Sequence, residues 1–255
     1  MRGDDMRRGT AQQAVTQTAA LTYGAYLRLP QLLGQQVPRT AVAYDEQLFI
    51  TVHQVHELWF KQLLVELTDA RDRMLAGDSA TAVRRLRRCR EIERALLSAL
   101  ELLDTMAPHD FQAFRGALGS ASGAQSAQFH EVEAVSAGRG RTRAMGWLTD
   151  AERARLDRRL LEPTLWDGFL AVLTGVPRAG RAAALRGEGP YGELADALLG
   201  HDEGWALWRH RHILVVERQI GGGRGTAGSS GAAHLRMRSA ERFFPELWEA
   251  RGAVL

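Results

Sequence analysis

Apolar residues at helical spacing run through a long stretch of this sequence, from Asp45 to Met74. They recur every three or four positions, which is the period of a helix that buries one face in a core. A second stretch, from Ala80 to Asp104, repeats the pattern and ends before Pro108, because proline disfavours the helical conformation in the residue before it. Two long core helices are therefore predicted. Their apolar positions are Leu48, Val52, Val55, Trp59 and Leu63 in the first, and Val83, Leu86, Ile92, Leu96, Leu100 and Leu103 in the second.

The rest of the sequence also favours helices. It shows neither convincing β-strand alternation nor an internal repeat, and residues 107–145 read as short helical pieces between small-residue turns. The sequence therefore predicts an all-α fold, a single-domain helical bundle over residues 19–255 that follows a flexible polar tail at 1–18. A further helix is expected over 150–174, followed by a loop at Gly187–Tyr191. The next helix is expected to run from near Asp202 to the glycines at 221–223, because glycine is preferred just past a helix end. A final helix is expected from about Ala232.

The composition is that of a soluble globular protein. A chain of 255 residues can bury one good core, and 45% hydrophobic with 25% charged residues is ordinary. The amino-terminal residues lack an apolar signal region, and no run approaches the roughly 20 apolar residues of a membrane helix. Cys89 is the only cysteine, which excludes an intramolecular disulfide and fits a reducing compartment. We expect a cytoplasmic protein without a membrane partner.

The formal charge of +3 comes almost wholly from arginine, since Lys61 is the only lysine. Arginine-rich clusters such as residues 84–88 lie inside an amphipathic helical pattern with acidic residues nearby. Binding to nucleic acid requires a concentrated basic face with base-reading groups. We therefore expect no nucleic-acid partner.

His53 lies on the first long helix beside Phe49. A hydrogen-bonded core histidine is the ordinary alternative at such a position. His53 and His56 are three positions apart and offer a helix face that could chelate a metal, but Glu57 does not complete the zinc-protease pattern. The aromatic neighbour of His53 suits an aromatic guest better than a hydrated metal ion.

His212 shares a helix face with Trp205, Trp208 and Val215, so it is predicted to face inward, whereas His210 is predicted to lie on the surface. Imidazole is a common ligand of haem iron. An inward histidine without other ligand types nearby indicates either haem iron or a core hydrogen bond.

A glycine-rich loop follows this helix. Residues 223–228 match the G-x-G-x-x-G pattern, but the dinucleotide fingerprint requires a preceding strand and here a helix precedes the loop. A flexible linker is the ordinary interpretation of residues 221–231. The alternative is a mobile lid, in which Thr226, Ser229 and Ser230 offer hydroxyl groups to a polar ligand.

Phe111 and Arg115 are four positions apart, so they project from the same face of a helix. An aromatic wall beside an arginine suits an aromatic amino acid, because its ring packs on phenylalanine while the guanidinium group binds its carboxylate with two hydrogen bonds. An ordinary surface arginine is the alternative.

With these residues in place, the sequence resembles the tryptophan 2,3-dioxygenase family over most of its length, from Tyr23 to about Arg251. The resemblance implies an enzyme with haem b, active in the ferrous state, that uses O₂ to cleave the indole C2–C3 bond of L-tryptophan and gives N-formylkynurenine. It also implies a homotetramer. The segments that carry the resemblance are residues 21–27, 45–61, 111–128 and 208–235.

The resemblance also implies roles for individual residues. His212 would be the proximal ligand of the haem iron, and Ser122 would lie close to the haem pocket. His53 would lie on the distal side near bound O₂, where it orients oxygen or the indole N–H rather than acting as an essential base. The implied substrate-binding residues are Phe49 and Phe111 around the indole, Arg115 at the carboxylate, Thr226 at the amino-acid end, and Tyr23, Tyr26 and Leu27 from a neighbouring subunit.

Four positions depart from the usual family pattern. Ala124 stands where phenylalanine is usual, His130 where arginine is usual, Ala227 in place of a loop glycine, and Tyr44 in place of a histidine. The small side chain of Ala124 suggests a related haem oxygenase of specialised metabolism, which would act on a substituted tryptophan or indole and insert one oxygen atom. A non-catalytic haem-binding protein and a helical interaction protein without haem are competing hypotheses from different functional classes. The phenylalanines and the arginine argue against the haem-binding protein, since a protein that only binds haem needs no amino-acid pocket. The interaction protein without haem predicts a colourless protein, whereas a haem protein shows a Soret band.

Overall fold

The computed structural model describes residues 21–41, 44–138, 145–223, 225 and 231–252. The chain divides into two compact units, residues 1–37 and 38–255, and each is described by itself. The division falls within the segment 19–255 that the sequence suggests as one domain, and that domain boundary stays a prediction.

Two short helices form the described part of the first unit. Helix α1 (Tyr23–Tyr26) begins at Thr22, whose hydroxyl oxygen accepts a hydrogen bond from the N–H of Ala25 at 3.3 Å. Helix α2 (Leu29–Leu33) follows Arg28, which has a left-handed backbone with φ of 53°. Neither helix buries a residue, and the side chains of Tyr23 and Tyr26 are 75% and 72% exposed.

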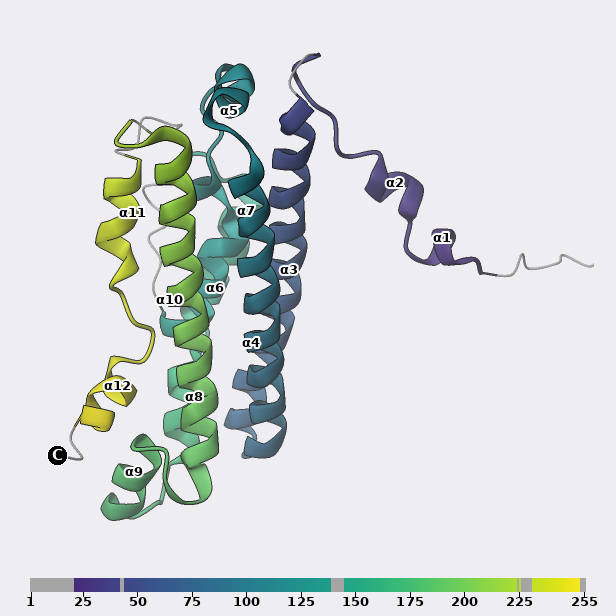
Figure 1. Cartoon of the computed structure of the whole chain (residues 1–255). Helices are drawn as coiled ribbons and strands as arrows, with labels where there is room; N and C mark the ends of the chain where they lie inside the picture. The colour runs from purple at the N-terminus through teal and green to yellow at the C-terminus, as the bar shows by residue number, and fades with distance from the viewer. Residues whose placement is uncertain (1–20, 42–43, 139–144, 224, 226–230, 253–255) are drawn as a thin grey trace, which may run out of the picture. The chain divides into compact units, whose positions relative to one another are not determined.

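Three long helices form the scaffold of the second unit and lie side by side (Figure 1). They are α3 (Tyr44–Leu75), α4 (Ser79–Glu101) and α10 (Gly192–Ile220). Both α3 and α10 pack on α4. The two predicted long helices are confirmed, with the difference that Trp59 is exposed.

The core of the second unit lies between these helices. Each fully buried leucine contributes about 1.5–3 kcal/mol relative to an exposed one. Cys89 also lies in this core, and burial raises the pKa of its thiol well above the usual 9.0, so a structural role fits this cysteine. The largest side chains with less than 2% exposure include Leu63 and Leu67 of α3, Leu86 and Leu96 of α4, and Trp205 of α10.

The prediction of one helix over 150–174 was wrong. The chain forms α7 (Asp150–Leu161) and α8 (Leu165–Val172), because Pro163 cannot continue a helix and Thr164 caps the next one. The Thr164 hydroxyl accepts a hydrogen bond from the N–H of Asp167 at 3.1 Å, and the Asp167 carboxylate accepts one from the N–H of Thr164 at 2.8 Å.

The last part of the chain also differs from prediction. Helix α10 begins at Gly192 rather than near Asp202, and α9 (Arg178–Leu185) precedes it. The single helix expected from about Ala232 is two helices, α11 (Ala232–Ser239) and α12 (Pro245–Gly252). Helix α10 ends at Gly221, with φ of 56°, close to the predicted end.

Shorter elements complete the fold. Every regular element within the described ranges is helical, which confirms the all-α prediction. In the same ranges, no helix is both long enough and apolar enough to span a membrane. The shorter elements are η1 (Leu102–Thr105), α5 (Pro108–Arg115), η2 (Gly116–Leu118), η3 (Gly123–Gln125), α6 (Ala127–Ala137) and η5 (Gly189–Tyr191).

A buried polar network joins α10 to α4 and α6. His201 of α10 bonds through Nδ1 to the carboxylate of Glu93 at 2.5 Å and through Nε2 to the hydroxyl of Ser136 at 2.9 Å. These three side chains are at most 1% exposed. Burial raises the pKa of the Glu93 carboxyl, while the neighbouring His201 opposes that shift. Because buried polar groups are costly when unpaired, this network fixes α10 at one position along α4.

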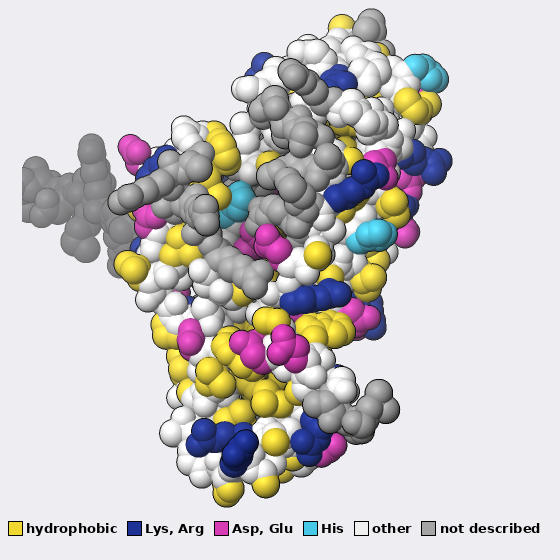
Figure 2. Space-filling model, turned by 90° about the vertical axis from the view of Figure 1, so that its left-hand side faces the viewer, with side chains coloured by type: hydrophobic (Ala, Val, Ile, Leu, Met, Phe, Trp, Pro, Cys, Tyr) yellow, Lys and Arg dark blue, Asp and Glu magenta, His cyan; other side chains and the backbone are white. Residues whose placement is uncertain are grey.

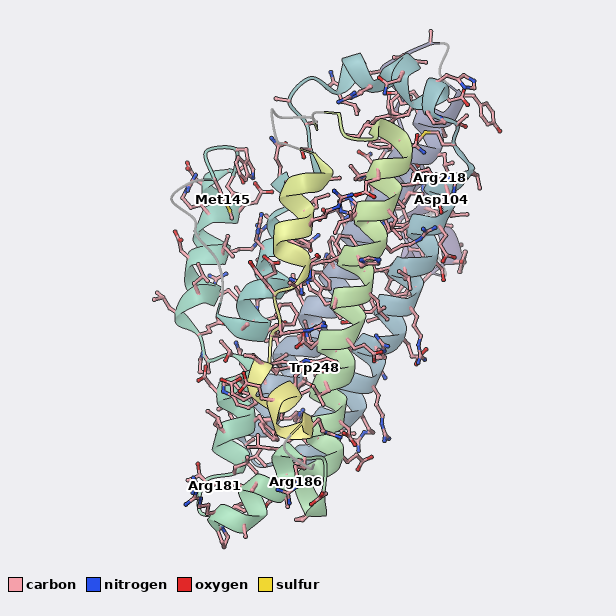
Figure 3. All side chains as sticks on the ribbon, turned by 60° about the vertical axis from the view of Figure 1, so that its left-hand side comes forward. Asp104, Met145, Arg181, Arg186, Arg218 and Trp248 are labelled. Atoms are coloured by element: carbon pink, nitrogen blue, oxygen red, sulfur yellow. The ribbon has the colours of Figure 1, made fainter. Side chains whose placement is uncertain are left out.

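Asp202, also buried, fixes the C-terminal helices to α10. Its Oδ2 atom accepts hydrogen bonds from the backbone N–H groups of Phe243 and Phe244, at 3.0 and 3.2 Å, and from the indole N–H of Trp248 at 2.9 Å. Figure 3 shows Trp248 against α10. Three donors thus compensate the burial of one oxygen of this carboxylate.

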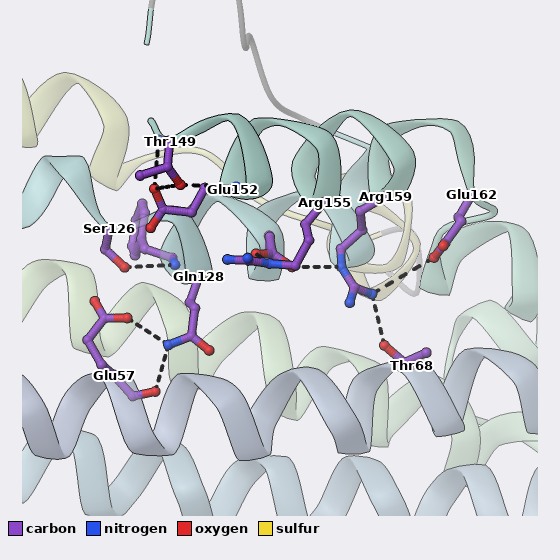
Figure 4. Close-up of polar contacts among 11 residues, drawn as sticks. Glu57, Thr68, Ser126, Gln128, Thr149, Glu152, Arg155, Arg159 and Glu162 are labelled. Atoms are coloured by element: carbon purple, nitrogen blue, oxygen red, sulfur yellow. Dashed lines mark hydrogen bonds and ion pairs between the residues drawn. The ribbon is translucent and has the colours of Figure 1, made fainter. Parts of the chain in front are cut away.

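Arginines of the second unit pair with acidic side chains. On the face drawn in Figure 2, acidic side chains lie beside the arginines. The buried Glu131 of α6 pairs with Arg155 and Arg159 of α7 at 3.3 and 3.4 Å, and Arg159 also donates to the Thr68 hydroxyl of α3 at 3.0 Å (Figure 4). These contacts hold α7 against α6 and α3. Within the cluster at 84–88, Arg85 and Arg88 pair with Glu66, and Arg87 pairs with Glu193.

A carboxylate also fixes the entry to α3. The buried Glu46 accepts hydrogen bonds from the backbone N–H groups of Arg39 and Thr40, both at 2.8 Å, and from the Thr40 hydroxyl at 2.5 Å. Burial alone would raise the pKa of Glu46, but these hydrogen bonds together lower it below the usual 4.5. Residues 38–40 are thereby held against the helix that carries His53.

Candidate functional site

His212 of α10 presents a neutral imidazole. Its ring stacks on Trp208, with centroids 5.4 Å apart and planes 14° apart. Burial, with smaller effects from His53 and His56, lowers its pKa from 6.5 to about 4. At neutral pH the imidazole is therefore unprotonated and able to bind a metal.

His53 of α3 lies close enough to His212 to influence its pKa. Its Nδ1–H donates a hydrogen bond to the Phe49 carbonyl at 2.7 Å. Burial lowers the pKa of His53, although this hydrogen bond and the nearby Glu57 oppose the shift. The neutral ring with a proton on Nδ1 leaves Nε2 as an acceptor. His53 can therefore accept a hydrogen bond from a ligand N–H.

An aromatic wall stands beside His53. The Phe49 ring lies 4.1 Å from the His53 ring, 5.9 Å from Phe111 and 5.4 Å from Phe114, measured between centroids. Phe111 and Phe114 make a perpendicular pair at 5.4 Å. Phe114 was not predicted from the sequence, although its spacing of three residues from Phe111 places both on one helix face. Arg115, the last residue of α5, is half-buried at the end of this wall.

His56 points into the core instead. Its side chain is 6% exposed, its Nδ1–H donates to the Val52 carbonyl at 2.8 Å, and its ring lies 5.9 Å from Trp208 and 6.0 Å from Phe60. Over the described part of the chain, no three histidine, cysteine or acidic side chains form a group that could hold a metal ion. A metal bound through His212 must therefore bring most of its own ligands, as the iron of a haem does.

Ser122 begins the short helix η3 and is half-buried. Its hydroxyl oxygen accepts a hydrogen bond from the N–H of Ala124 at 3.4 Å. The imidazole Nε2–H of the buried His130 donates to the Ala124 carbonyl at 3.0 Å. Two of the departures from the family pattern, Ala124 and His130, are thus in direct contact. His210, by contrast, is exposed on α10, as the sequence predicts.

The structure does not test the roles predicted for four further residues. Thr226 lies outside the described residues. Tyr23, Tyr26 and Leu27 belong to the first unit, where the leucine is 40% exposed. Their predicted roles stay predictions.

The fold and the site together define an all-α protein in which a neutral histidine suited to haem iron lies near a second histidine and a phenylalanine wall. The sequence model of the tryptophan 2,3-dioxygenase family matches residues 8–145 and 185–254. The chain belongs to the tryptophan 2,3-dioxygenase family.

Three relatives named tryptophan 2,3-dioxygenase match almost the whole chain. The protein of Nocardioides sp. (strain ATCC BAA-499 / JS614) is 47% identical, and the match covers 93% of this chain and 96% of that protein. The protein of Herpetosiphon aurantiacus is 39% identical over 91% of this chain and 98% of its own. The protein of Anaeromyxobacter sp. (strain K) is 38% identical, and the match covers 93% of this chain and 97% of that protein. The resemblance predicted from the sequence motifs is confirmed.

Proposed function

We propose that this protein is a haem-dependent dioxygenase that cleaves the indole C2–C3 bond of L-tryptophan with O₂ and gives N-formylkynurenine. Family membership supports the reaction. The single structural observation that carries the proposal is the neutral, desolvated imidazole of His212, in a region that also contains His53 and the Phe49 wall.

The residues present fit a haem. His212 offers an unprotonated ring nitrogen, and the half-buried Ser122 offers a hydroxyl group at the turn before η3. We assign His212 as the iron ligand and Ser122 as a residue at the haem edge. When bound, ferrous haem b supplies the activation of O₂ that cleavage of a carbon–carbon bond requires.

The protein side chains would then orient the substrate. Phe49 and Phe111 pack on the indole ring, and the fork of Arg115 binds the carboxylate. His53 holds its proton on Nδ1 through the Phe49 carbonyl, so its Nε2 accepts the indole N–H. These contacts fix the ring carbons at the reactive position, which converts binding energy into rate. Thr226 is proposed to contact the amino-acid end of the substrate.

We further propose a cytoplasmic homotetramer in which Tyr23, Tyr26 and Leu27 complete the site of a neighbouring subunit. The first unit supports this, because its two helices bury none of their own residues and expose two tyrosines. Light scattering of the full chain tests the assembly. A double Tyr23→Ser, Tyr26→Ser variant should raise KM for tryptophan if these side chains reach a substrate.

The reaction is tested with ferrous, haem-loaded protein, L-tryptophan and ¹⁸O₂. Mass spectrometry should find two labelled atoms in each product molecule. One labelled atom would instead support the monooxygenase alternative, in which a related enzyme acts on a substituted tryptophan or indole. Ala124 stands where the family usually has the larger ring of phenylalanine, so tryptophans substituted on the indole belong in the same assay.

The iron ligand is tested by His212→Ala. This change should abolish or shift the Soret band, and His210→Ala, an exposed histidine two positions earlier on the same helix, should leave it unchanged. An unaltered Soret band in the His212 variant would remove the ligand assignment.

A further inference from the structure

Three aromatic rings form a ladder along one face of α10. Trp205 stacks on Trp208 with centroids 5.4 Å and planes 22° apart, and Trp208 stacks on His212 at 5.4 Å and 14°. The ring spacing equals the helix pitch of about 5.4 Å, because residues three or four positions apart lie one turn apart on the same face. At this distance, nearly parallel rings stack with an offset, which is a favourable arrangement.

Trp208, the middle ring, is held on its other sides as well. It is 7% exposed and lies 5.8 Å from Phe60, 5.7 Å from Phe129 and 5.9 Å from His56, between centroids. These neighbours come from α3 and α6, and the Phe60 ring is nearly perpendicular to Trp208. The indole cannot turn without displacing rings on two other helices, so it presents a fixed plane to His212.

His212 has no comparable polar support in the described part of the structure. A histidine that binds a metal usually donates its second ring N–H to a carboxylate or a carbonyl, which fixes the ring plane. Here the electrostatic neighbours of His212 are His53 and His56, and no carboxylate of the described residues is among them. Among the described residues, the stack on Trp208 is the ring contact that constrains the plane of His212.

We propose that Trp208 is a positioning residue that sets the ring plane of His212 as an iron ligand, in place of the usual hydrogen-bonded partner. This inference rests on the proposed role of His212 in binding haem. Rotation of the imidazole about its bond to iron changes how the ring overlaps the metal orbitals. By holding the imidazole in one orientation, the stack would give a single geometry to the bond between His212 and iron when haem is bound.

The experiment compares four variants as ferrous, haem-loaded protein and measures the iron–histidine stretching band by resonance Raman spectroscopy. Trp208→Leu removes the planar face, and Trp208→Met removes it while keeping a long, flexible side chain that fills space. Trp208→Phe restores a planar ring. Trp205→Leu is the matched control, because Trp205 is a buried member of the same ladder with no ring contact to His212. The haem reduction potential is recorded for each variant.

We expect the band to shift or broaden in the leucine and methionine variants at position 208, with a change in reduction potential. We expect it to stay sharp and close to wild type in Trp208→Phe and in Trp205→Leu. An unchanged band in Trp208→Leu or Trp208→Met would overturn the inference. An equal change in Trp205→Leu would also overturn it, since general packing would then be the cause. If His212→Ala keeps the iron–histidine band, the ligand assignment itself fails, which is a different result from failure of the stack.

Discussion

Two glycines one turn apart on α10 should respond to alanine in opposite directions. A Cβ atom at Gly204 would overlap the Glu93 carboxylate, with its Cδ atom only 2.7 Å away, and would also crowd the guanidinium of Arg90. A Cβ atom at Gly200 would meet no atom within 4 Å. Gly204 therefore permits the close approach of α10 to α4, and Gly200 does not serve that purpose.

The sizes of the opposing effects decide whether alanine raises or lowers the free energy of unfolding at each glycine. Alanine is better than glycine inside a helix by about 1 kcal/mol, and this gain applies at both sites. At Gly204 the overpacking costs about 1–3 kcal/mol. The displaced Glu93 carboxylate must also weaken its 2.5 Å bond to His201, and a hydrogen bond to a charged group is worth about 1.5–3 kcal/mol. We expect Gly204→Ala to lower the free energy of unfolding by about 2–4 kcal/mol, and Gly200→Ala to raise it by about 0.5–1 kcal/mol.

The assay is urea unfolding followed by far-ultraviolet circular dichroism, at equal haem occupancy for all variants. The midpoint should fall for Gly204→Ala and rise slightly for Gly200→Ala, with similar slopes. A Gly204→Ala protein as stable as wild type would refute the reasoning. It would mean that Glu93 moves aside without cost, and that the network with His201 does not fix the position of α10.

Three further outcomes follow from contacts already described. Glu46→Gln should lower the free energy of unfolding by about 1–2 kcal/mol near neutral pH. Because the folded pKa of Glu46 is lowered, its stabilisation is present above pH 4.5 and is lost as the pH falls through the folded pKa, so urea midpoints of the variant and wild type should converge in acid. Arg115→Lys should lower kcat/KM for L-tryptophan by roughly 10- to 100-fold, while turnover of tryptamine, which lacks the carboxylate, should change little; equal losses for both would refute the assigned contact. Ser136→Ala removes the partner of His201 Nε2 and should cost about 1–3 kcal/mol in the same urea assay, and no loss would show that the contact is not stabilising.

Much of the scaffold follows from apolar periodicity alone. The helices α3 and α4 and the C-terminal end of α10 were predicted because long amphipathic patterns with clear ends are strong signals. The start of α10 was missed, because Gly192, Gly200 and Gly204 suggest an interrupted helix. Packing against α4 overrides that weak local preference. At Pro163, by contrast, the local preference prevails over the periodic pattern, and this single residue divides one apparent helix into two.

The candidate site was predicted in part. Spacing along one helix indicated the inward side of His212 and the shared face of Phe111 and Arg115. Contacts between elements distant in sequence cannot be read from spacing. The approach of Phe49 to Phe114 depends on how α3 and α5 pack. The hydrogen bond from His130 to the carbonyl of Ala124, only six residues away, depends on the local turn before α6.

The position of Asp202 has a consequence for the order of assembly during synthesis. All of α10 emerges from a ribosome before its three N–H donors, which belong to Phe243, Phe244 and Trp248. Until those residues are made, a packed α10 would enclose an uncompensated negative charge, which costs several kcal/mol. We therefore expect α10, the long helix that bears the proposed iron ligand, to reach its final packing only once Phe243, Phe244 and Trp248 are in place.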